Sequence, residues 1–169
     1  MNRKSFVAVI MGSDSDLGTM SNTLDVLEKL GIAYEVKIAS AHRTPDFTQA
    51  YVKEADRRGC AVFIAAAGLA NHLSGTIAAL TVKPVIGVPM ATGPLQGQDA
   101  LFSTVQMPGG IPVACVAIGS PGAKNAAYLA AEILALSDQE VARRLVADRE
   151  AIAAEVVAKD AALGKKLEN

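Results

Sequence analysis

The sequence predicts an α/β fold in which helices cover both faces of a five-stranded parallel sheet. The first observation is that strand-like and helix-like segments alternate five times along the chain. The second is that 51% of the residues are hydrophobic but only 4% are aromatic, so Ala, Val, Ile and Leu supply the apolar mass that buried parallel strands need. The third is the length: 169 residues without a repeat, a low-complexity run or a shift in composition predict one domain over residues 1–169.

Five apolar runs are predicted as strands because each is short and is bounded by glycine, proline or small polar residues. They are residues 6–11, 34–39, 61–65, 84–88 and 113–118. Helices are predicted over 17–30, 45–58, 99–105 and 124–136, with a further short one ending near residue 81 and a loop at 119–122. Gly31 is placed to end the first helix, and Asp138 is placed to cap the last.

The last helix, residues 138–163, is long for so small a domain. At the rise of an α-helix it extends roughly 37 Å, enough to overhang its own sheet. Apolar residues are spread along its whole length. Two interpretations remain open: the helix docks on a neighbouring subunit, or it packs only on its own sheet.

Composition excludes several classes of function. The net charge of −1 argues against a general binder of nucleic acid or of an anionic membrane. Cys60 and Cys115 have neither CxxC nor zinc spacing, which predicts reduced thiols and a cytoplasmic protein. Two histidines without suitably spaced carboxylates predict no metal. No apolar run has the length of a membrane span or a signal peptide.

In an open parallel sheet, the loops at the carboxyl ends of the strands form the ligand crevice. This rule gathers four loops at one edge: residues 12–16, 40–45, 66–75 and 89–97. The first, Gly-Ser-Asp-Ser-Asp, precedes a helix whose free N–H groups suit a phosphate. Its hydroxyls fit a phosphate and its Asp16 fits sugar hydroxyls, but helix capping by Ser15 or Asp16 explains the motif equally well. Neither a GxGxxG fingerprint nor a Walker A loop is present, so neither NAD nor ATP is implied.

The second loop, Ser40-Ala41-His42-Arg43-Thr44-Pro45, carries the strongest chemical signal. Histidine gains and loses a proton near neutral pH, and arginine offers a planar, permanently charged fork to phosphate. Because no nucleophile motif is evident, we predict acid–base chemistry by His42 on a small phosphorylated substrate. A structural histidine and a solvated arginine are the alternatives. His72 is expected to cap or pin its loop.

Four segments, read in order, resemble the N5-carboxyaminoimidazole ribonucleotide mutase family: MGSDSD at 11–16, SAHRTP at 40–45, QMPGGIPV at 106–113 and GAKNAA at 122–127. The resemblance covers nearly the whole chain. It implies a flavodoxin-like α/β/α sandwich, a homo-octamer with the C-terminal helix on a neighbouring subunit, and a carboxylate transfer in purine biosynthesis without cofactor or metal. It also implies His42 as general acid and base, with Ser13, Ser15, Asp16, Ser40 and Arg43 binding the ribonucleotide and His72 closing over its base.

Within residues 65–75 this chain is poorer in glycine than the mutase pattern. Asn71 and Ser74 there resemble a sister enzyme, an aminoimidazole ribonucleotide carboxylase that uses free CO2, whereas Arg43, His72 and the GGIPV segment favour the mutase. The Ala65–Gly68 run is expected to line a small apolar pocket for CO2. A non-catalytic nucleotide-binding module on the same scaffold is the alternative of another class.

Overall fold

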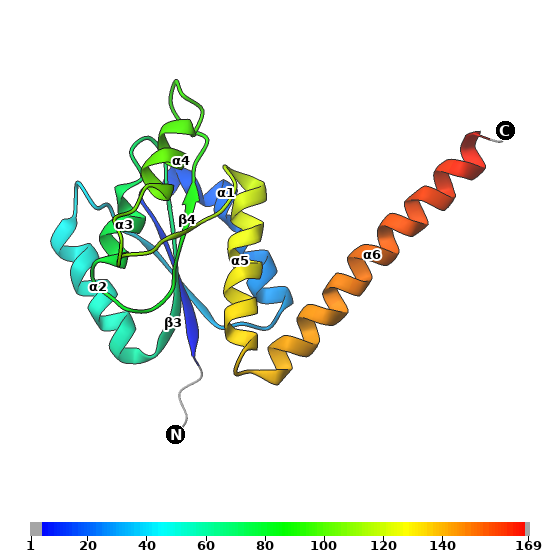
Figure 1. The fold of residues 1–169 in the computed structure, drawn as a ribbon, viewed down its shortest axis with the longest axis horizontal. Coiled ribbons are helices and arrows are strands. Elements are labelled where there is room, and N and C mark those ends of the chain that lie inside the picture. Colours follow the sequence, from blue (N-terminus) through cyan, green and yellow to red (C-terminus); the bar gives the residue numbers. More distant parts are fainter. Residues whose placement is uncertain (1–4, 168–169) are drawn as a thin grey trace.

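The computed structural model describes residues 5–167, which form a three-layer α/β/α sandwich with one helix projecting from it (Figure 1). The strands are β1 (Phe6–Met11), β2 (Tyr34–Ile38), β3 (Cys60–Ala67), β4 (Val85–Pro89) and β5 (Ala114–Cys115). The helices are α1 (Leu17–Lys29), α2 (Pro45–Arg58), α3 (His72–Ala78), α4 (Gln98–Val105), α5 (Ser120–Ala135) and α6 (Gln139–Leu167), and a single 3-10 turn, η1 (Asp14–Asp16), leads into α1. The predicted fold class is confirmed.

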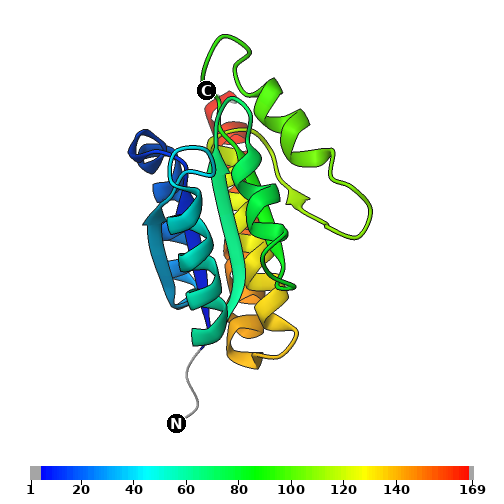
Figure 2. The same cartoon turned by 90° about the vertical axis from the view of Figure 1, so that its left-hand side faces the viewer.

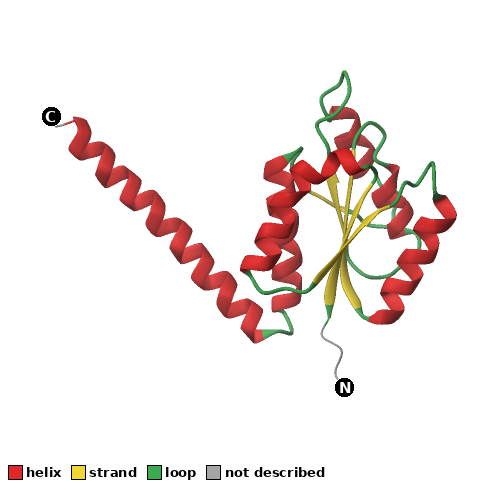
Figure 3. Cartoon of the chain, turned by 180° about the vertical axis from the view of Figure 1, so that it is seen from behind, coloured by secondary structure: helices red, strands yellow, loops and turns green. Residues whose placement is uncertain are grey.

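The sheet is parallel throughout, with strand order β2-β1-β3-β4-β5. This is the flavodoxin-like order, in which the first two strands are added towards one edge of the sheet and the later ones towards the other, so that a topological switch point lies between β1 and β3. Every residue of β1 is buried, as expected for a strand covered on both faces. All strands point the same way, so their carboxyl ends meet at one edge (Figure 3).

Each face of the sheet has its own hydrophobic core. On one face α1 and α5 pack together, and a run of fully buried alanines on α5 lets the two helices approach closely. On the other face α2 and α3 cover Phe63 and its neighbours. Figure 2 shows α2 and α3 in front of the sheet and α5 behind it. Gly31 ends α1 as predicted, in the left-handed conformation at φ 63° that glycine adopts most readily.

The predicted elements around residues 113–124 need correction. The expected strand at 113–118 contains only two paired residues, Ala114 and Cys115, and beyond them the N–H groups of Val116 and Gly119 each donate singly to a β4 carbonyl. The predicted loop at 119–122 is instead the first turn of α5, which begins at Ser120 rather than Lys124. Pro121 is tolerated in a first turn. Gly122 lets the helix start there, since a Cβ at this position would stand 1.6 Å from the Ala117 carbonyl oxygen.

Helix α6 leaves the body of the molecule (Figure 1). Asp138 caps it as predicted, its Oδ1 accepting hydrogen bonds from the N–H groups of Glu140 at 2.9 Å and Val141 at 3.2 Å. Only Val141 and Asp148 of this helix are buried, and every residue from 149 to 167 is exposed. The overhang predicted from its length is therefore present, while its docking on another subunit remains a prediction. None of the helices within residues 5–167 combines the length and apolarity that crossing a bilayer requires.

Candidate active site

A cleft of about 720 Å³ opens at the carboxyl edge of the sheet. Four loops line it, each following one of the adjacent strands β2, β1, β3 and β4. These are the four loops that the strand-end rule gathers. The volume lies within the range of small-molecule sites. Of the predicted site residues, the structure brings Ser13, Ser15, Asp16, Ser40, His42 and Arg43 into this lining. Their roles stay predictions.

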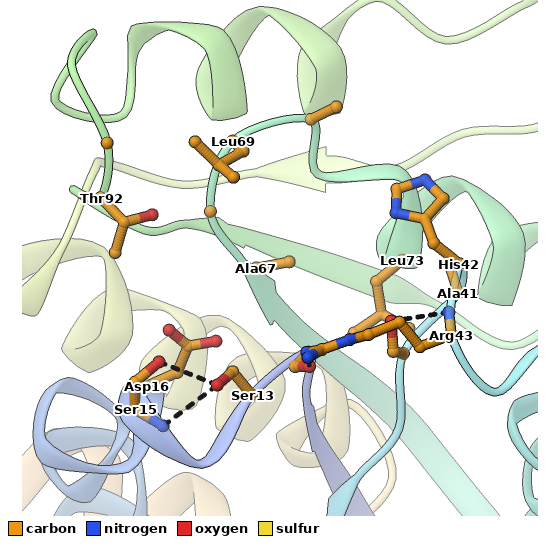
Figure 4. Close-up of a pocket in the computed structure, with 15 residues that line it drawn as sticks. Ser13, Ser15, Asp16, Ala41, His42, Arg43, Ala67, Leu69, Leu73 and Thr92 are labelled. Atoms are coloured by element: carbon orange, nitrogen blue, oxygen red, sulfur yellow. Dashed lines mark hydrogen bonds between the residues drawn. The ribbon is translucent and has the colours of Figure 1, made fainter.

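The turn after β1 is organised by Ser13, which neither capping alternative anticipated. The Ser13 hydroxyl oxygen accepts a bond from the Ser15 N–H at 3.3 Å and another from the Ser15 hydroxyl at 2.9 Å. Ser15 therefore donates to the cap, and the Asp16 side chain makes no capping bond. Both hydroxyls face the cleft at the beginning of a helix (Figure 4). This turn can offer hydroxyl and backbone donors to an anion.

Asp16 lines the cleft and is buried, with only 4% of its surface exposed. Burial raises the pKa of its carboxyl group above the usual value, against the hydrogen bond at Ser13 that lowers it. Such a carboxylate lacks full hydration and gains from hydroxyl donors. This environment is suited to accepting hydrogen bonds from a polyol such as ribose.

Arg43 crosses the floor of the cleft from the second loop to the first (Figure 4). Its Nη2 donates to the Gly12 carbonyl at 3.1 Å, which aims the guanidinium at the serine turn. The loop is held by Ser40, whose hydroxyl oxygen accepts from the Arg43 N–H at 3.1 Å. The Ser40 N–H in turn donates to the Thr44 hydroxyl at 2.9 Å. Arg43 is thus pre-positioned beside Ser13 and Ser15, as a phosphate site requires.

The two histidines meet at the other side of the cleft. His42 Nε2 lies 2.8 Å from His72 Nδ1, and the rings contact edge to face with centroids 4.9 Å apart. His42 stands at the rim of the cleft (Figure 4), whereas His72 begins α3 just outside the lining. The expectation that His72 caps or pins its loop did not include this contact with His42.

The loops after β3 and β4 make the apolar wall. Ala65 and Ala66 are fully buried in the sheet, so of the expected alanine run only Ala67 and Gly68 reach the cleft. Gly68 permits close packing of the two loops, since a Cβ there would stand 1.7 Å from the Thr92 hydroxyl oxygen.

Sequence reasoning did not single out five lining residues on this side of the cleft: Leu69, Ala70, Leu73, Thr92 and Gly93. The loops were predicted at this edge, but periodicity does not tell which loop side chains point inward. The left-handed backbone of Leu69, at φ 55°, has no signal in the sequence.

Within residues 5–167 no group of three or more His, Cys, Asp or Glu side chains is arranged to hold a metal ion. The absence of a metal or cofactor from the reaction stays a prediction. The side chains that remain can bind an anion, accept from hydroxyl groups and transfer a proton next to a small apolar wall.

This fold and cleft define a flavodoxin-like α/β protein with a cleft at the strand ends, lined by serine hydroxyls, a guanidinium, a carboxylate and an imidazole. A sequence profile described as AIR carboxylase matches residues 6–155, and the chain belongs to that family. It is similar to the N5-carboxyaminoimidazole ribonucleotide mutase of Thermotoga maritima, with 53% identity over 90% of this chain and 88% of that protein. The mutase of Pseudomonas aeruginosa is 58% identical over 77% of this chain and 80% of that protein. The crystal structure of PurE from Treponema denticola superposes with a TM-score of 0.83 at 33% identity, covering 93% and 97% of the two chains.

Proposed function

We propose that this chain is an N5-carboxyaminoimidazole ribonucleotide mutase of purine biosynthesis. The observation that carries the proposal is the cleft itself: His42 stands opposite an Arg43–serine anion site, with a small apolar wall between them. The relatives that bear the mutase name are 49–58% identical to this chain over most of its length. The enzyme is an isomerase that moves a carboxylate from N5 of its substrate to C4 of the imidazole ring.

The phosphate of the ribonucleotide binds at the serine turn. Arg43 supplies the positive charge, and Ser13 and Ser15 supply hydroxyl donors, with Ser40 holding the Arg43 loop. Asp16 accepts from the ribose hydroxyls, to which its buried carboxylate is suited. The base then lies towards His42 and the apolar wall formed by Ala67, Gly68 and Leu73. His72 stands beside the base, at the start of α3.

His42 acts as both acid and base. Protonated His42 gives its proton to N5, the N5–carboxylate carbon bond breaks, and the products are aminoimidazole ribonucleotide and CO2. The electron-rich C4 then attacks CO2 to form the new carbon–carbon bond. His42 finally removes the C4 proton and is protonated again, so protons and electrons balance over the cycle. CO2 must stay between the two steps, which the apolar wall favours.

The test supplies one of two carboxyl donors, without ATP. Rapid formation of 4-carboxy-5-aminoimidazole ribonucleotide from N5-carboxyaminoimidazole ribonucleotide alone supports the mutase. Equal or faster formation from aminoimidazole ribonucleotide and bicarbonate identifies the direct carboxylase. The residue types at positions 71 and 74, Asn71 and Ser74, resemble the pattern of that enzyme. Tight binding of both nucleotides without turnover identifies a binding module and contradicts the proposal.

The same proposal includes a homo-octamer, in which α6 packs on a neighbouring subunit. The support is the apolar side chains that α6 exposes beyond the body of the molecule, including Ile152, Val156 and Leu163. They recur at spacings of four and seven residues, which places them along one face of the helix.

A cytoplasmic location also belongs to this proposal. Cys60 and Cys115 are both free, and burial raises the pKa of the Cys60 thiol to about 12. Reduced, unreactive thiols suit a reducing compartment.

A further inference from the structure

The contact between the two histidines joins residues 30 positions apart in the sequence and has a defined geometry. Nε2 of His42 and Nδ1 of His72 are separated by 2.8 Å, a full hydrogen bond. One nitrogen must carry the bridging proton, and the other must offer a lone pair. No atom within residues 5–167 bonds to Nδ1 of His42, so this nitrogen is left to meet a ligand.

The direction of the bond follows from the chemistry of imidazole. A neutral imidazole side chain carries its proton more often on Nε2 than on Nδ1. If His42 Nε2 donates and His72 Nδ1 accepts, both rings hold this preferred tautomer. The reverse direction would put both rings in the less favoured one. The geometry therefore favours donation from His42 to His72, which leaves the lone pair of His42 on Nδ1.

We propose that His72 is a positioning residue, which holds the Nε2 proton of His42 so that Nδ1 alone exchanges protons with the substrate. This inference rests on the proposed function, in which His42 first gives a proton and later takes one back. After the first transfer, neutral His42 could move to the other tautomer and turn its lone pair away from C4. The bond to His72 prevents this change, so the nitrogen that gave the proton to N5 is the one that removes the proton from C4.

The loop that carries His72 is anchored well enough for this task. The preceding residue, Asn71, is fully buried, and its N–H donates to the Ser103 hydroxyl oxygen at 2.9 Å. Ser103 in turn donates to the Asp99 carbonyl within α4 at 2.8 Å. Leu73, which follows His72, is buried in the hydrophobic core on the face of the sheet that α2 and α3 cover. The His72 ring thus projects from a backbone fixed on both sides.

The experiment compares His72→Asn with His72→Leu. Asparagine places a carbonyl oxygen near the position of Nδ1 and keeps the acceptor, whereas leucine of similar size removes it. His72 is exposed in this chain, so both variants should fold, which thermal melting checks. We expect His72→Leu to lose roughly 10- to 100-fold in kcat with KM within about twofold, and His72→Asn to recover most of that loss. Equal kcat in the two variants would overturn the proposal, because a merely structural role does not distinguish them.

A second measurement needs no substrate. The chain has only two histidines, so labelling them with 15N gives a simple spectrum, which the two variants assign. In the ligand-free protein at mildly alkaline pH, we expect a bridging proton with one-bond coupling to His42 Nε2 and a weaker coupling across the hydrogen bond to His72 Nδ1. One-bond coupling to His72 Nδ1 instead, or no bridging proton, would overturn the assignment. Because this readout involves no turnover, a wild-type protein with the bridge but without mutase activity would contradict only the proposed function.

Discussion

At the scale of single residues, adjacent side chains serve different parts of the cleft. Arg43 turns towards β1 and bonds to the Gly12 carbonyl, while His42 turns towards α3 and bonds to His72. Substituting each in turn should therefore separate catalysis from binding.

His42→Asn should fold and bind the substrate but lose about 10²- to 10⁴-fold in kcat, the usual contribution of a general acid–base group. Asparagine keeps polarity and approximate size but cannot carry the proton between N5 and C4. The measurement is kcat for the conversion of N5-carboxyaminoimidazole ribonucleotide, with calorimetric affinity for the product as the control. Turnover near the wild-type value would remove His42 from acid–base duty.

Arg43→Ala should act mainly on affinity. Losing a charged hydrogen-bond donor to phosphate costs about 1.5–3 kcal/mol, which raises KM roughly 10- to 100-fold. The matched comparison is Lys53→Ala, a cation on α2 that does not line the cleft and should leave KM unchanged. An unchanged KM in Arg43→Ala would contradict the phosphate assignment.

The strand-end rule was sufficient to predict that the loops carrying His42, Arg43 and the serine turn lie at one edge of the sheet. The reason is that the carboxyl ends of parallel strands meet at the same edge whatever their side chains. The rule could not pair His42 with His72, since that contact depends on the strand order β2-β1-β3 and on where α3 begins. Nor could it choose Ser13 as the cap of the first turn, because Ser, Asp and Ser follow one another there and only the backbone decides which is non-helical.

At the scale of elements, the bounds of α2 and of the edge strand β2 were predictable, whereas the end of β5 and the start of α5 were not. Pro45 and Gly59 delimit α2, whose bounds agree with the prediction. β5 pairs with β4 over Ala114 and Cys115 only, and from there to the start of α5 at Ser120 the contact with β4 consists of single bonds from the N–H groups of Val116 and Gly119. Its hydrophobic residues suggested a longer strand, yet none of residues 113–118 is buried in this chain, because a hydrophobic run by itself determines neither burial nor strand pairing at the edge of a sheet.

The base of α6 is fastened to α1 and α5 through Asp148, whose carboxylate forms an ion pair with Lys29 and accepts a bond from the Tyr128 hydroxyl at 2.7 Å. Burial by itself would raise the pKa of Asp148, but the bonds from Lys29 and Tyr128 outweigh it and lower the pKa below its usual value. The stability from this carboxylate is therefore present above about pH 4 and is lost as the pH falls through the lower folded value.

Asp148→Asn should therefore lower the free energy of unfolding by about 1–3 kcal/mol at pH 7. The difference from wild type should shrink as the pH falls from about 4 through the lower folded pKa, where the wild-type carboxylate becomes protonated as well. Denaturant titrations at several pH values and one protein concentration measure both effects. The control is Arg149→Gln, which breaks the exposed Arg149–Glu132 ion pair between α6 and α5. This substitution should lower the free energy of unfolding by less than about 1 kcal/mol. A pH-independent difference for Asp148→Asn would contradict the ionic role.

At the scale of the whole molecule, the apolar side chains that α6 exposes are not accounted for by packing within the single chain. Its 29 residues extend about 43 Å, and the apolar side chains beyond residue 149 contact nothing in this chain that buries them. The sequence predicted the overhang from helix length but left the partner open, since an amphipathic face looks the same whichever surface covers it.

If a second copy covers this face, Val156→Asp should break the assembly while leaving the sandwich folded. Val156 is 61% exposed in the single chain, so the substitution buries no charge within it. Sedimentation velocity should show a smaller species than wild type, with unchanged circular dichroism. The control is Glu155→Gln, next to it on the helix, whose side chain is 70% exposed. Identical sedimentation of Val156→Asp and wild type would exclude α6 from the contact.

The cleft draws its lining from four loops between residues 12 and 93, and the order of the strands brings those loops together only in the complete sandwich. A ligand that binds in this cleft therefore stabilises the native state as a whole and not one local segment. Unreactive analogues of the nucleotide should thus raise the melting temperature with increasing dose, so candidate ligands can be ranked by heating alone, before any turnover assay exists.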